Sequence, residues 1–283
     1  MPKGRHGLRG AAVGCAPYIL KEMRKDVNIL VIGDVTSPTG VEYLGKNLWR
    51  IREENKIDFC VVNGENAAFI TGISEELAEI LFAAGADVIT GGNHTLRNRA
   101  AFTYLDDKAE ILRPINFGGA AAGRGYTVVD NGGYRILVIN AMGNIHIDPV
   151  LDNPYPYIDK VLDTERGNYD FSVLDIHAEA TGEKAAMGYA YDGKINIVFG
   201  THTHVQTADE KILPCGTGYI SDVGMCGESG GVLGMDAESV VLRMRTRVPN
   251  KFKLADGKVE ANGVIFTLDT KTKRVEKIKR ITF

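Results

Sequence analysis

The chain has 283 residues, of which 44% are hydrophobic, so it is long enough and apolar enough to bury a sizeable core. Its net charge of −3 gives no basic field that would hold a nucleic-acid backbone by itself, and we therefore expect no long nucleic acid as a partner. No apolar run approaches the ~18 residues that would predict a membrane span.

The N-terminal segment differs from the rest of the chain. Its string Ala-Val-Gly-Cys15 faintly resembles a lipoprotein cleavage site, but His6 and Arg9 interrupt the apolar stretch that such a signal needs. We predict a tail over residues 1–26 and a single domain over 27–283. Four cysteines without paired spacing predict neither a zinc ribbon nor a disulfide framework, and they favour a reducing, cytoplasmic location.

The first half of the domain predicts repeated βα units. Apolar, β-branched runs predict strands, and each is followed by apolar residues at helical spacing. The strands are expected at 28–33, 58–62 and 87–90, and the helices at 41–55, 74–84 and 98–106. Ser74 is the expected N-cap of the second helix, and Gly85 its expected C-cap.

The second half predicts more strands than helices. A hairpin is expected over 125–130 and 134–140, helices over 155–166, 181–189 and 236–244, and strands over 171–176, 195–199, 250–256, 260–268 and 273–282. The glycine-rich stretch 215–235 predicts a loop crossing that stays outside the core. The expected fold is α/β, with two sheets packed face to face and helices outside.

Residues able to bind metal follow the ends of five predicted strands. Asp34, Glu65 with Asn66, Asn93 with His94, and His177 each come directly after an apolar run, and His202 and His204 follow the run 195–199. In an open α/β sheet, ligands bind beyond the carboxyl ends of the strands. We therefore expect these side chains to meet at one edge. Because residues two apart share a side of an extended strand, both His202 and His204 are expected to face that space.

The donor set favours two metal ions. It comprises Asp34, Glu65, Asn66, Asn93, His177, His202 and His204. Seven oxygen and nitrogen donors exceed what one tetrahedral zinc needs, and they suit two ions of higher coordination number, with Glu65 bridging them. Such donors fit Mn, Fe or Zn. Gly91 and Gly92 would let the backbone approach a bound group closely.

A pair of ions that activates a shared hydroxide suits displacement at phosphorus. His94 is the natural general acid for the leaving oxygen, and the alternative is that it serves as an eighth ligand. Arg113 is a candidate contact for a phosphate oxygen. His146 is expected to be structural or simply exposed.

The motif series resembles that of the calcineurin-like metallophosphoesterases. NGENAA (63–68), GNHT (92–95), RPINF (113–117), HAEATGEK (177–184), GTHTHVQTAD (200–209), DVGM (222–225) and LGMD (233–236) resemble the bacterial YmdB-type branch, a 2′,3′-cyclic nucleotide phosphodiesterase family. This resemblance covers residues 27–283. It implies a four-layer α/β/β/α sandwich.

The resemblance also implies a dinuclear, iron-containing site. By motif, Asp34, Asn66 and His204 would bind one metal, Asn93, His177 and His202 the other, and Glu65 both, with His94 as proton donor. The wider superfamily has a histidine where this chain has Thr36, and the YmdB-type pattern has Trp-Asp where this chain has Leu96-Arg97. The second departure concerns the substrate pocket.

The expected activity is hydrolysis of 2′,3′-cyclic nucleotides, and of other small phosphodiesters, by attack of a metal-bridging hydroxide. One alternative is a phosphomonoesterase or nucleotidase that uses the same site. A second alternative is a regulatory, RNA-associated protein in which turnover is incidental. A homo-oligomer is compatible with the sequence.

Overall fold

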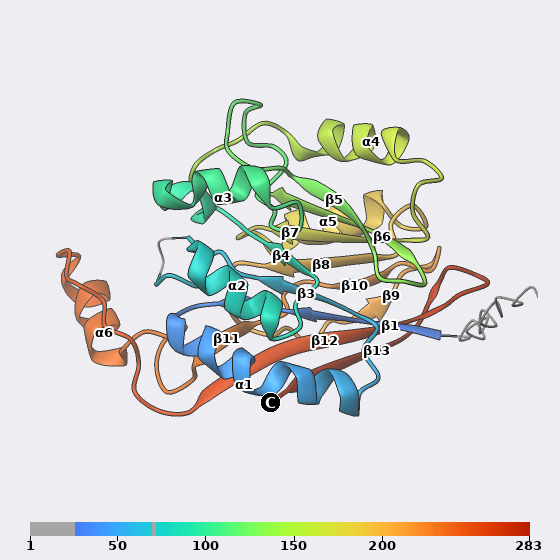
Figure 1. The fold of residues 1–283 in the computed structure, drawn as a ribbon. Helices are drawn as coiled ribbons and strands as arrows, with labels where there is room; N and C mark the ends of the chain where they lie inside the picture. The colour runs from blue at the N-terminus through green and yellow to red at the C-terminus, as the bar shows by residue number, and fades with distance from the viewer. Residues whose placement is uncertain (1–25, 70–71) are drawn as a thin grey trace, which may run out of the picture.

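The structure is a computed structural model that describes residues 26–69 and 72–283. Two β-sheets pack face to face, with α4 and α1 on opposite outer sides (Figure 1). The seven-stranded sheet has the order β2 (Asp34–Val35), β11 (Met225–Glu228), β12 (Val259–Asp269), β1 (Asp26–Ile32), β3 (Phe59–Asn63) and β4 (Val88–Thr90), with β13 (Val275–Thr282) also paired to β12.

The six-stranded sheet has the order β5 (Tyr126–Asp130), β6 (Arg135–Met142), β7 (Phe171–His177), β8 (Ile197–Thr201), β10 (Gly218–Ile220) and β9 (Lys211–Ile212). Strands β6, β7, β8 and β10 are parallel, as are β1, β3 and β4 in the other sheet. Each parallel set therefore brings its carboxyl ends to one edge, which is what the predicted site requires.

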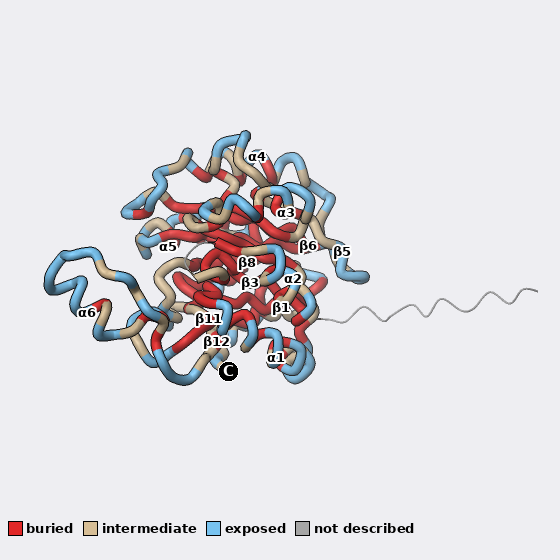
Figure 2. Tube along the Cα trace, turned by 60° about the vertical axis from the view of Figure 1, so that its left-hand side comes forward, coloured by how far each residue is buried: buried red, intermediate tan, exposed pale blue. Residues whose placement is uncertain are grey.

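Alternation along the strands separates the three hydrophobic clusters. On β1, Ile29 and Val31 pack into the cluster between the sheets, whereas Leu30 and Ile32 pack under the helices. A strand with two buried faces reads as a continuous apolar run, which is why β1 is hydrophobic throughout. Burial accordingly concentrates in the strands at the centre of the molecule (Figure 2).

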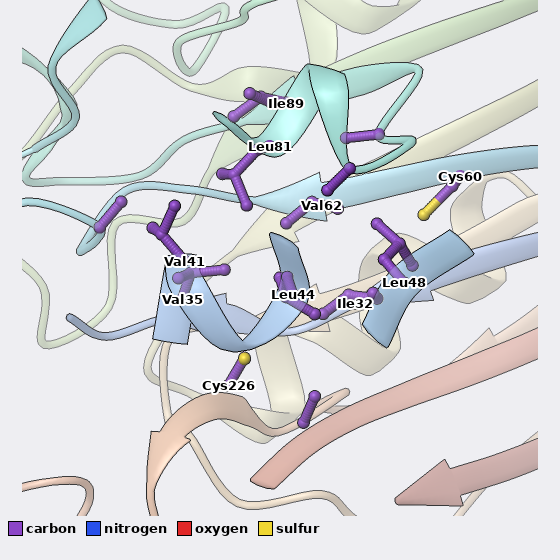
Figure 3. Packing of buried hydrophobic residues seen from close by; sticks show 14 of the residues in the cluster. Ile32, Val35, Val41, Leu44, Leu48, Cys60, Val62, Leu81, Ile89 and Cys226 are labelled. Atoms are coloured by element: carbon purple, nitrogen blue, oxygen red, sulfur yellow. The ribbon is translucent and has the colours of Figure 1, made fainter. Parts of the chain in front are cut away.

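Helices α1 (Pro38–Glu54) and α2 (Glu75–Ala83) cover the outer face of the seven-stranded sheet. Their apolar side chains meet those of the strands in the cluster that Figure 3 shows, where Leu44 and Leu48 lie beside Ile32 and Leu81 lies near Val62. Burying a leucine side chain in this way contributes about 1.5–3 kcal/mol. Ser37 and Ser74 cap the two helices, as the side chain of each accepts a backbone N–H of the first turn.

On the other side, α4 (Pro154–Thr164) and α5 (Thr181–Ala190) cover the six-stranded sheet through Ile158, Val161 and Met187. The predicted α/β/β/α order of layers is confirmed. Within the described residues, no helix is both long enough and apolar enough to cross a membrane. Cys60, Cys215 and Cys226 are free thiols, in agreement with the prediction of no disulfide framework, and Cys15 lies outside the described residues.

Three predicted elements are wrong in detail. The stretch 215–235 was expected to stay outside the core, but it contains β10 and β11, one in each sheet. Its glycines allow close packing, since a Cβ on Gly218 would lie 2.7 Å from the Phe266 ring. The stretch 250–256 forms only an isolated bridge instead of a strand. The expected helix 98–106 is a 3-10 turn (Arg99–Ala101) followed by α3 (Phe102–Asp107), and a further 3-10 turn (Thr95–Arg97) precedes it.

The N-terminal boundary also shifts. The sequence predicts a tail that ends at residue 26, whereas Asp26 begins β1 and pairs with Asp269 of β12. The remainder of that prediction, residues 1–25, lies outside the described residues.

Candidate metal centre

The structure brings all the predicted ligands together at the carboxyl ends of the strands. Asp34 lies in β2, Glu65 and Asn66 follow β3, Asn93 follows β4, His177 ends β7, and His202 and His204 follow β8. The centre lies where the two sheets meet, because three of these segments come from the seven-stranded sheet and two from the other. Asp34, Glu65, Asn66 and His177 are buried.

One group of donors converges on the Nε2 atom of His177. Glu65 Oε1 lies 3.3 Å from it, Asn93 Oδ1 lies 3.1 Å from it, and His202 Nδ1 lies 3.1 Å from it. A single proton on this nitrogen can satisfy only one of the three lone pairs. A cation held between them would satisfy all three. This group therefore fits a metal ion with mixed nitrogen and oxygen ligands.

A second group surrounds Asp34. Its Oδ1 atom is buried and accepts no hydrogen bond from the described residues, and His204 Nε2 lies 3.7 Å from it. Buried carboxylate oxygens are normally paired or bound to a metal. Asn66 brings its Nδ2 atom within 3.4 Å of His204 Nε2, so its oxygen would reach a metal here only after the amide rotates by half a turn.

Hydrogen bonds behind His177 fix which of its nitrogens is free. Thr201 Oγ1 donates to Asp175 Oδ1 at 2.8 Å, so it accepts from His177 Nδ1 at 2.9 Å. With one proton fixed on Nδ1, Nε2 is the nitrogen that could offer its lone pair to a metal. Outer hydrogen bonds of this kind orient metal-binding histidines.

The loop after β8 differs from the sequence expectation. Strand β8 ends at Thr201, and His202 and His204 have φ values of 100° and 63°, so they are not alternate residues of an extended strand. Both rings nevertheless reach the centre. Asp222 Oδ2 holds the residue between them, because it accepts the backbone N–H of Thr203 at 3.0 Å and its hydroxyl at 2.7 Å.

Gly92 lies against the centre. A Cβ at this position would collide with Glu65 Oε2 and His177 Nε2. The absence of a side chain here leaves the two ligands free to approach each other, in agreement with the prediction that these glycines permit a close backbone approach.

The electrostatics favour positive charge at the centre. Burial alone would raise the pKa of Glu65, but His177 and His94 outweigh it and hold the pKa well below its usual range. Burial would likewise lower the pKa of His177, but Glu65, Asp34 and Asp175 raise it to about 9. By contrast, burial and the neighbouring His177 lower the pKa of His202 to about 3. The carboxylates thus stabilise a nearby positive charge. In this arrangement that charge is the protonated imidazole of His177.

His94 lies at the rim of the centre. Its backbone N–H donates to Glu65 Oε2 at 2.9 Å, and its Nδ1 atom lies 2.6 Å from Asn66 Oδ1. The amide of Asn66 therefore accepts from Nδ1–H, which leaves Nε2 as the ring nitrogen available to a substrate. Burial lowers the pKa of His94, and the carboxylate of Glu65 partly offsets that effect.

Two weaker candidates lie elsewhere. The guanidinium of Arg113 is buried and donates to the carbonyl oxygens of Pro114 at 2.9 Å and Ala122 at 3.3 Å, so it stabilises its own loop. His146 is exposed, as expected. The hydroxyl of Thr36 donates to the Cys226 carbonyl at 3.3 Å.

Sequence patterns do not single out four residues that contact or support the centre. Glu179 lies 3.1 Å from His202 Nε2, Lys184 is paired with Asp222, and Asp175 supports His177 through Thr201. Glu179 and Lys184 share one motif with His177, and Asp175 lies two residues before it on the same strand. The sequence shows these spacings. It does not show the contacts, because the partners of these residues are distant along the chain.

Two sheets between helical layers, with carboxylate, amide and imidazole donors gathered at the strand ends, define the calcineurin-like metallophosphoesterase fold. The model of the YmdB-like protein family matches residues 30–281. A 2′,3′-cyclic-nucleotide 2′-phosphodiesterase of Bacillus subtilis is 41% identical over 255 residues, which cover 90% of this chain and 96% of that protein. The chain therefore belongs to the YmdB-like family.

Solved structures agree with this assignment. A protein of Thermus thermophilus matches with a TM-score of 0.84 and 33% identity, and the match covers 91% of this chain and 99% of that one. A phosphatase of Mycoplasma pneumoniae matches with a TM-score of 0.84 and 32% identity, and the match covers 91% of this chain and 93% of that one.

Proposed function

We propose that this protein hydrolyses 2′,3′-cyclic nucleotides at the centre formed by Glu65, His177 and their neighbours. The observation that carries the proposal is the convergence of Glu65, Asn93 and His202 on His177 Nε2 in a chain 41% identical to a phosphodiesterase of that specificity. In this reaction a water oxygen adds to phosphorus, the bond from phosphorus to O2′ breaks, and O2′ takes up a proton. The products are a 3′-phosphate and a 2′-hydroxyl.

Two metal ions fit the donors. Asn93, His177 and His202 would hold one ion, Asp34 and His204 the other with Asn66 after rotation of its amide, and Glu65 both. Bound ions would lower the pKa of a water molecule and neutralise charge on the phosphoryl oxygens. Iron is the metal we propose, and manganese and zinc suit the same donors.

The residues of the chain have distinct tasks. His94 would hold a proton on Nε2 for the leaving O2′ once the Asn66 amide has rotated to serve the metal, because Asn66 Nδ2 would then face His94 Nδ1 and donate to it. Thr201 and Asp175 keep His177 in the required tautomer, and Asp222 keeps the loop between His202 and His204 in place.

The test compares two histidine variants. Purified wild type, His94→Asn and His146→Asn are stripped with a chelator, reloaded with Fe²⁺, Mn²⁺ or Zn²⁺, and assayed on 2′,3′-cAMP with identification of the product. We expect wild type and His146→Asn to form 3′-AMP, and His94→Asn to lose a factor of ~10²–10⁴ in kcat while it retains metal. Activity that persists after chelation, or a His94→Asn variant with full kcat, would contradict the proposal.

The choice of substrate distinguishes the proposed phosphodiesterase from a phosphomonoesterase. Bis-p-nitrophenyl phosphate and p-nitrophenyl phosphate differ in whether the phosphorus carries one ester bond or two. We expect turnover of the diester to exceed that of the monoester. The reverse preference would favour a phosphatase or nucleotidase at the same site.

A further inference from the structure

Arg97 lies one helical turn away from His94, the proposed proton donor. His94 precedes the 3-10 turn Thr95–Arg97, and the backbone N–H of Arg97 donates to the His94 carbonyl oxygen at 2.9 Å. A 3-10 turn has three residues per turn, so side chains three positions apart lie one above the other. Arg97 therefore shares the face of the turn that carries His94.

The protein holds the other two faces of this turn. Thr95 is buried, and its hydroxyl oxygen accepts the backbone N–H of Gly92 at 2.8 Å. Leu96 packs against the hydrophobic cluster under α1 and α2. The third face, with His94 and Arg97, is the one left to border the open side of the metal centre.

The turn ends at Asn98, which fixes the end of the segment that carries Arg97. Asn98 has φ −92° and ψ 93°, its side-chain amide donates to the Ile73 carbonyl at 3.1 Å, and its side-chain oxygen accepts the N–H of Ala100 at 3.2 Å. This extended residue interrupts the 3-10 geometry, so the next arginine, Arg99, does not continue the face of His94. Arg97 and Arg99 are both exposed, but only Arg97 is aligned with the proton donor.

The Arg97 guanidinium is available to a ligand. Among the residues that the structure describes, none forms an ion pair, a side-chain hydrogen bond or a ring contact with it. Its charge nevertheless reaches the neighbouring imidazole: burial is the main cause of the lowered pKa of His94, and the charge of Arg97 adds to it. A guanidinium offers paired N–H donors that match the oxygens of a phosphate group.

The alignment of Arg97 with His94 indicates which part of a substrate it meets, and this step rests on the proposed function. His94 serves the leaving O2′, so the ribose lies on the His94 side of the reacting phosphorus. Beyond the cyclic phosphate, that ribose carries the base at C1′ and the 5′ oxygen, and a second phosphate is attached at the 5′ oxygen. We infer that Arg97 binds a phosphate on O5′, and that the preferred substrates are 2′,3′-cyclic ribonucleotides with a 5′ phosphate.

This chemistry has two sources. A free nucleotide carries the 5′ phosphate as a monoester, and a short RNA with a cyclic phosphate at its 3′ end carries it as a diester to the preceding nucleotide. Arginine also binds the edge of guanine through two hydrogen bonds. The phosphate is favoured for an exposed guanidinium, because both partners of that contact are charged.

The test compares Mn²⁺-loaded wild type with Arg97→Gln and with the matched control Arg99→Gln, which removes the same charge two residues away. The substrates are 2′,3′-cAMP, its 5′-phosphorylated form, and the dinucleotide ApA with a 2′,3′-cyclic phosphate end. For wild type and Arg99→Gln, we expect at least one of the two 5′-phosphorylated substrates to have a KM ~10-fold below that of 2′,3′-cAMP. The substrate that gains identifies the source.

Arg97→Gln should remove this difference in KM. The kcat values of the three substrates should be similar, because the contact is made equally in the bound substrate and in the transition state. Raising the salt concentration should reduce the preference of the wild type, since the contact joins two exposed charges. Circular dichroism checks that each variant is folded.

A binding measurement gives a second readout that does not depend on turnover. Hydrolysis of the 5′-phosphorylated nucleotide would yield adenosine 3′,5′-bisphosphate, whereas 2′,3′-cAMP would yield 3′-AMP. In titration calorimetry on the Mn²⁺-loaded proteins, the bisphosphate should have a Kd ~10-fold below that of 3′-AMP for wild type and Arg99→Gln. The two Kd values should be equal for Arg97→Gln.

Equal KM values for the three substrates in wild type would overturn the inference. So would a 5′ preference that survives Arg97→Gln or is lost equally in Arg99→Gln. A preference for 2′,3′-cGMP over 2′,3′-cAMP that Arg97→Gln removes would assign Arg97 to the base and would also overturn it. If wild type hydrolysed none of these substrates, the proposed function would fail, and the calorimetric comparison would decide whether Arg97 binds a 5′ phosphate.

Discussion

The ammonium nitrogen of Lys184 lies 2.7 Å from Asp222 Oδ2, and both side chains are buried. Lys184 comes from α5, whereas Asp222 follows β10, so the pair joins a helix to the edge of the sheet below it. The same Asp222 oxygen accepts both hydrogen bonds from Thr203. The ion pair therefore sets the path of the loop that carries His202 and His204.

Replacing Lys184 by Met should destabilise the protein by about 3–5 kcal/mol, because Asp222 would remain as an uncompensated buried charge. The double variant Lys184→Met/Asp222→Leu removes both charges and should recover most of that stability. It should still bind Mn²⁺ more weakly than wild type, because Thr203 has lost its acceptor. Thermal unfolding and titration calorimetry measure the two effects, and wild-type Mn²⁺ affinity in the double variant would refute a positioning role.

Asp175 accepts hydrogen bonds from three segments. Its carboxylate accepts from Thr90 and Asn63 in one sheet and from Thr201 in the other. Asp175→Asn should weaken metal binding ~10–100-fold, because the chain of hydrogen bonds that fixes the tautomer of His177 is broken. Asp163→Asn, at an exposed carboxylate, serves as the control. Equal Mn²⁺ affinities for the two variants would show that the chain of hydrogen bonds is unimportant.

Gly92→Ala should abolish metal binding while the fold persists, since the new methyl group would collide with the ends of the Glu65 and His177 side chains. Gly118→Ala is the matched control, because a Cβ there meets no heavy atom within 4 Å. Metal content after reconstitution, measured by elemental analysis, is the readout. A Gly92→Ala protein with the wild-type metal content would contradict the geometry.

Asp209, which is not one of the candidate metal ligands, leads to a prediction of how folding stability depends on pH. Partial burial would raise its pKa, but hydrogen bonds from Ser221 and Thr207 outweigh burial and lower it. A carboxylate with a depressed pKa stabilises the folded state above its ordinary pKa of about 3.9, and this stabilisation is lost as the pH falls through the folded-state value.

Asp209→Asn should therefore be less stable than wild type at neutral pH, with the difference shrinking as the pH falls below about 4. Urea unfolding at a series of pH values measures this. A difference that stays constant or grows in acid would mean that the carboxylate charge is not responsible.

The sequence by itself determined the layers of the fold and the set of candidate ligands. Strand β1 is apolar along its whole length because both of its faces are buried, and residues such as Asp34 and His177 sit at strand ends that parallel topology brings to one edge. These features are local, so the alternation of apolar residues and the spacing of polar residues along the sequence predict them directly. The N-cap of α2 at Ser74 is predicted correctly for the same reason.

The tertiary structure decided what depends on contacts between distant segments. The glycine-rich stretch 215–235 looked like a loop, because the sequence does not show that Phe266 packs against Gly218 within a sheet. The left-handed backbone at His202 and His204 is held by Asp222 and Lys184, which no local pattern connects to that loop. The sequence makes Arg113 a candidate phosphate contact, and only the structure shows that its guanidinium also donates to carbonyl oxygens of its own loop. Sequence records what each residue can do, whereas only packing decides which groups it meets.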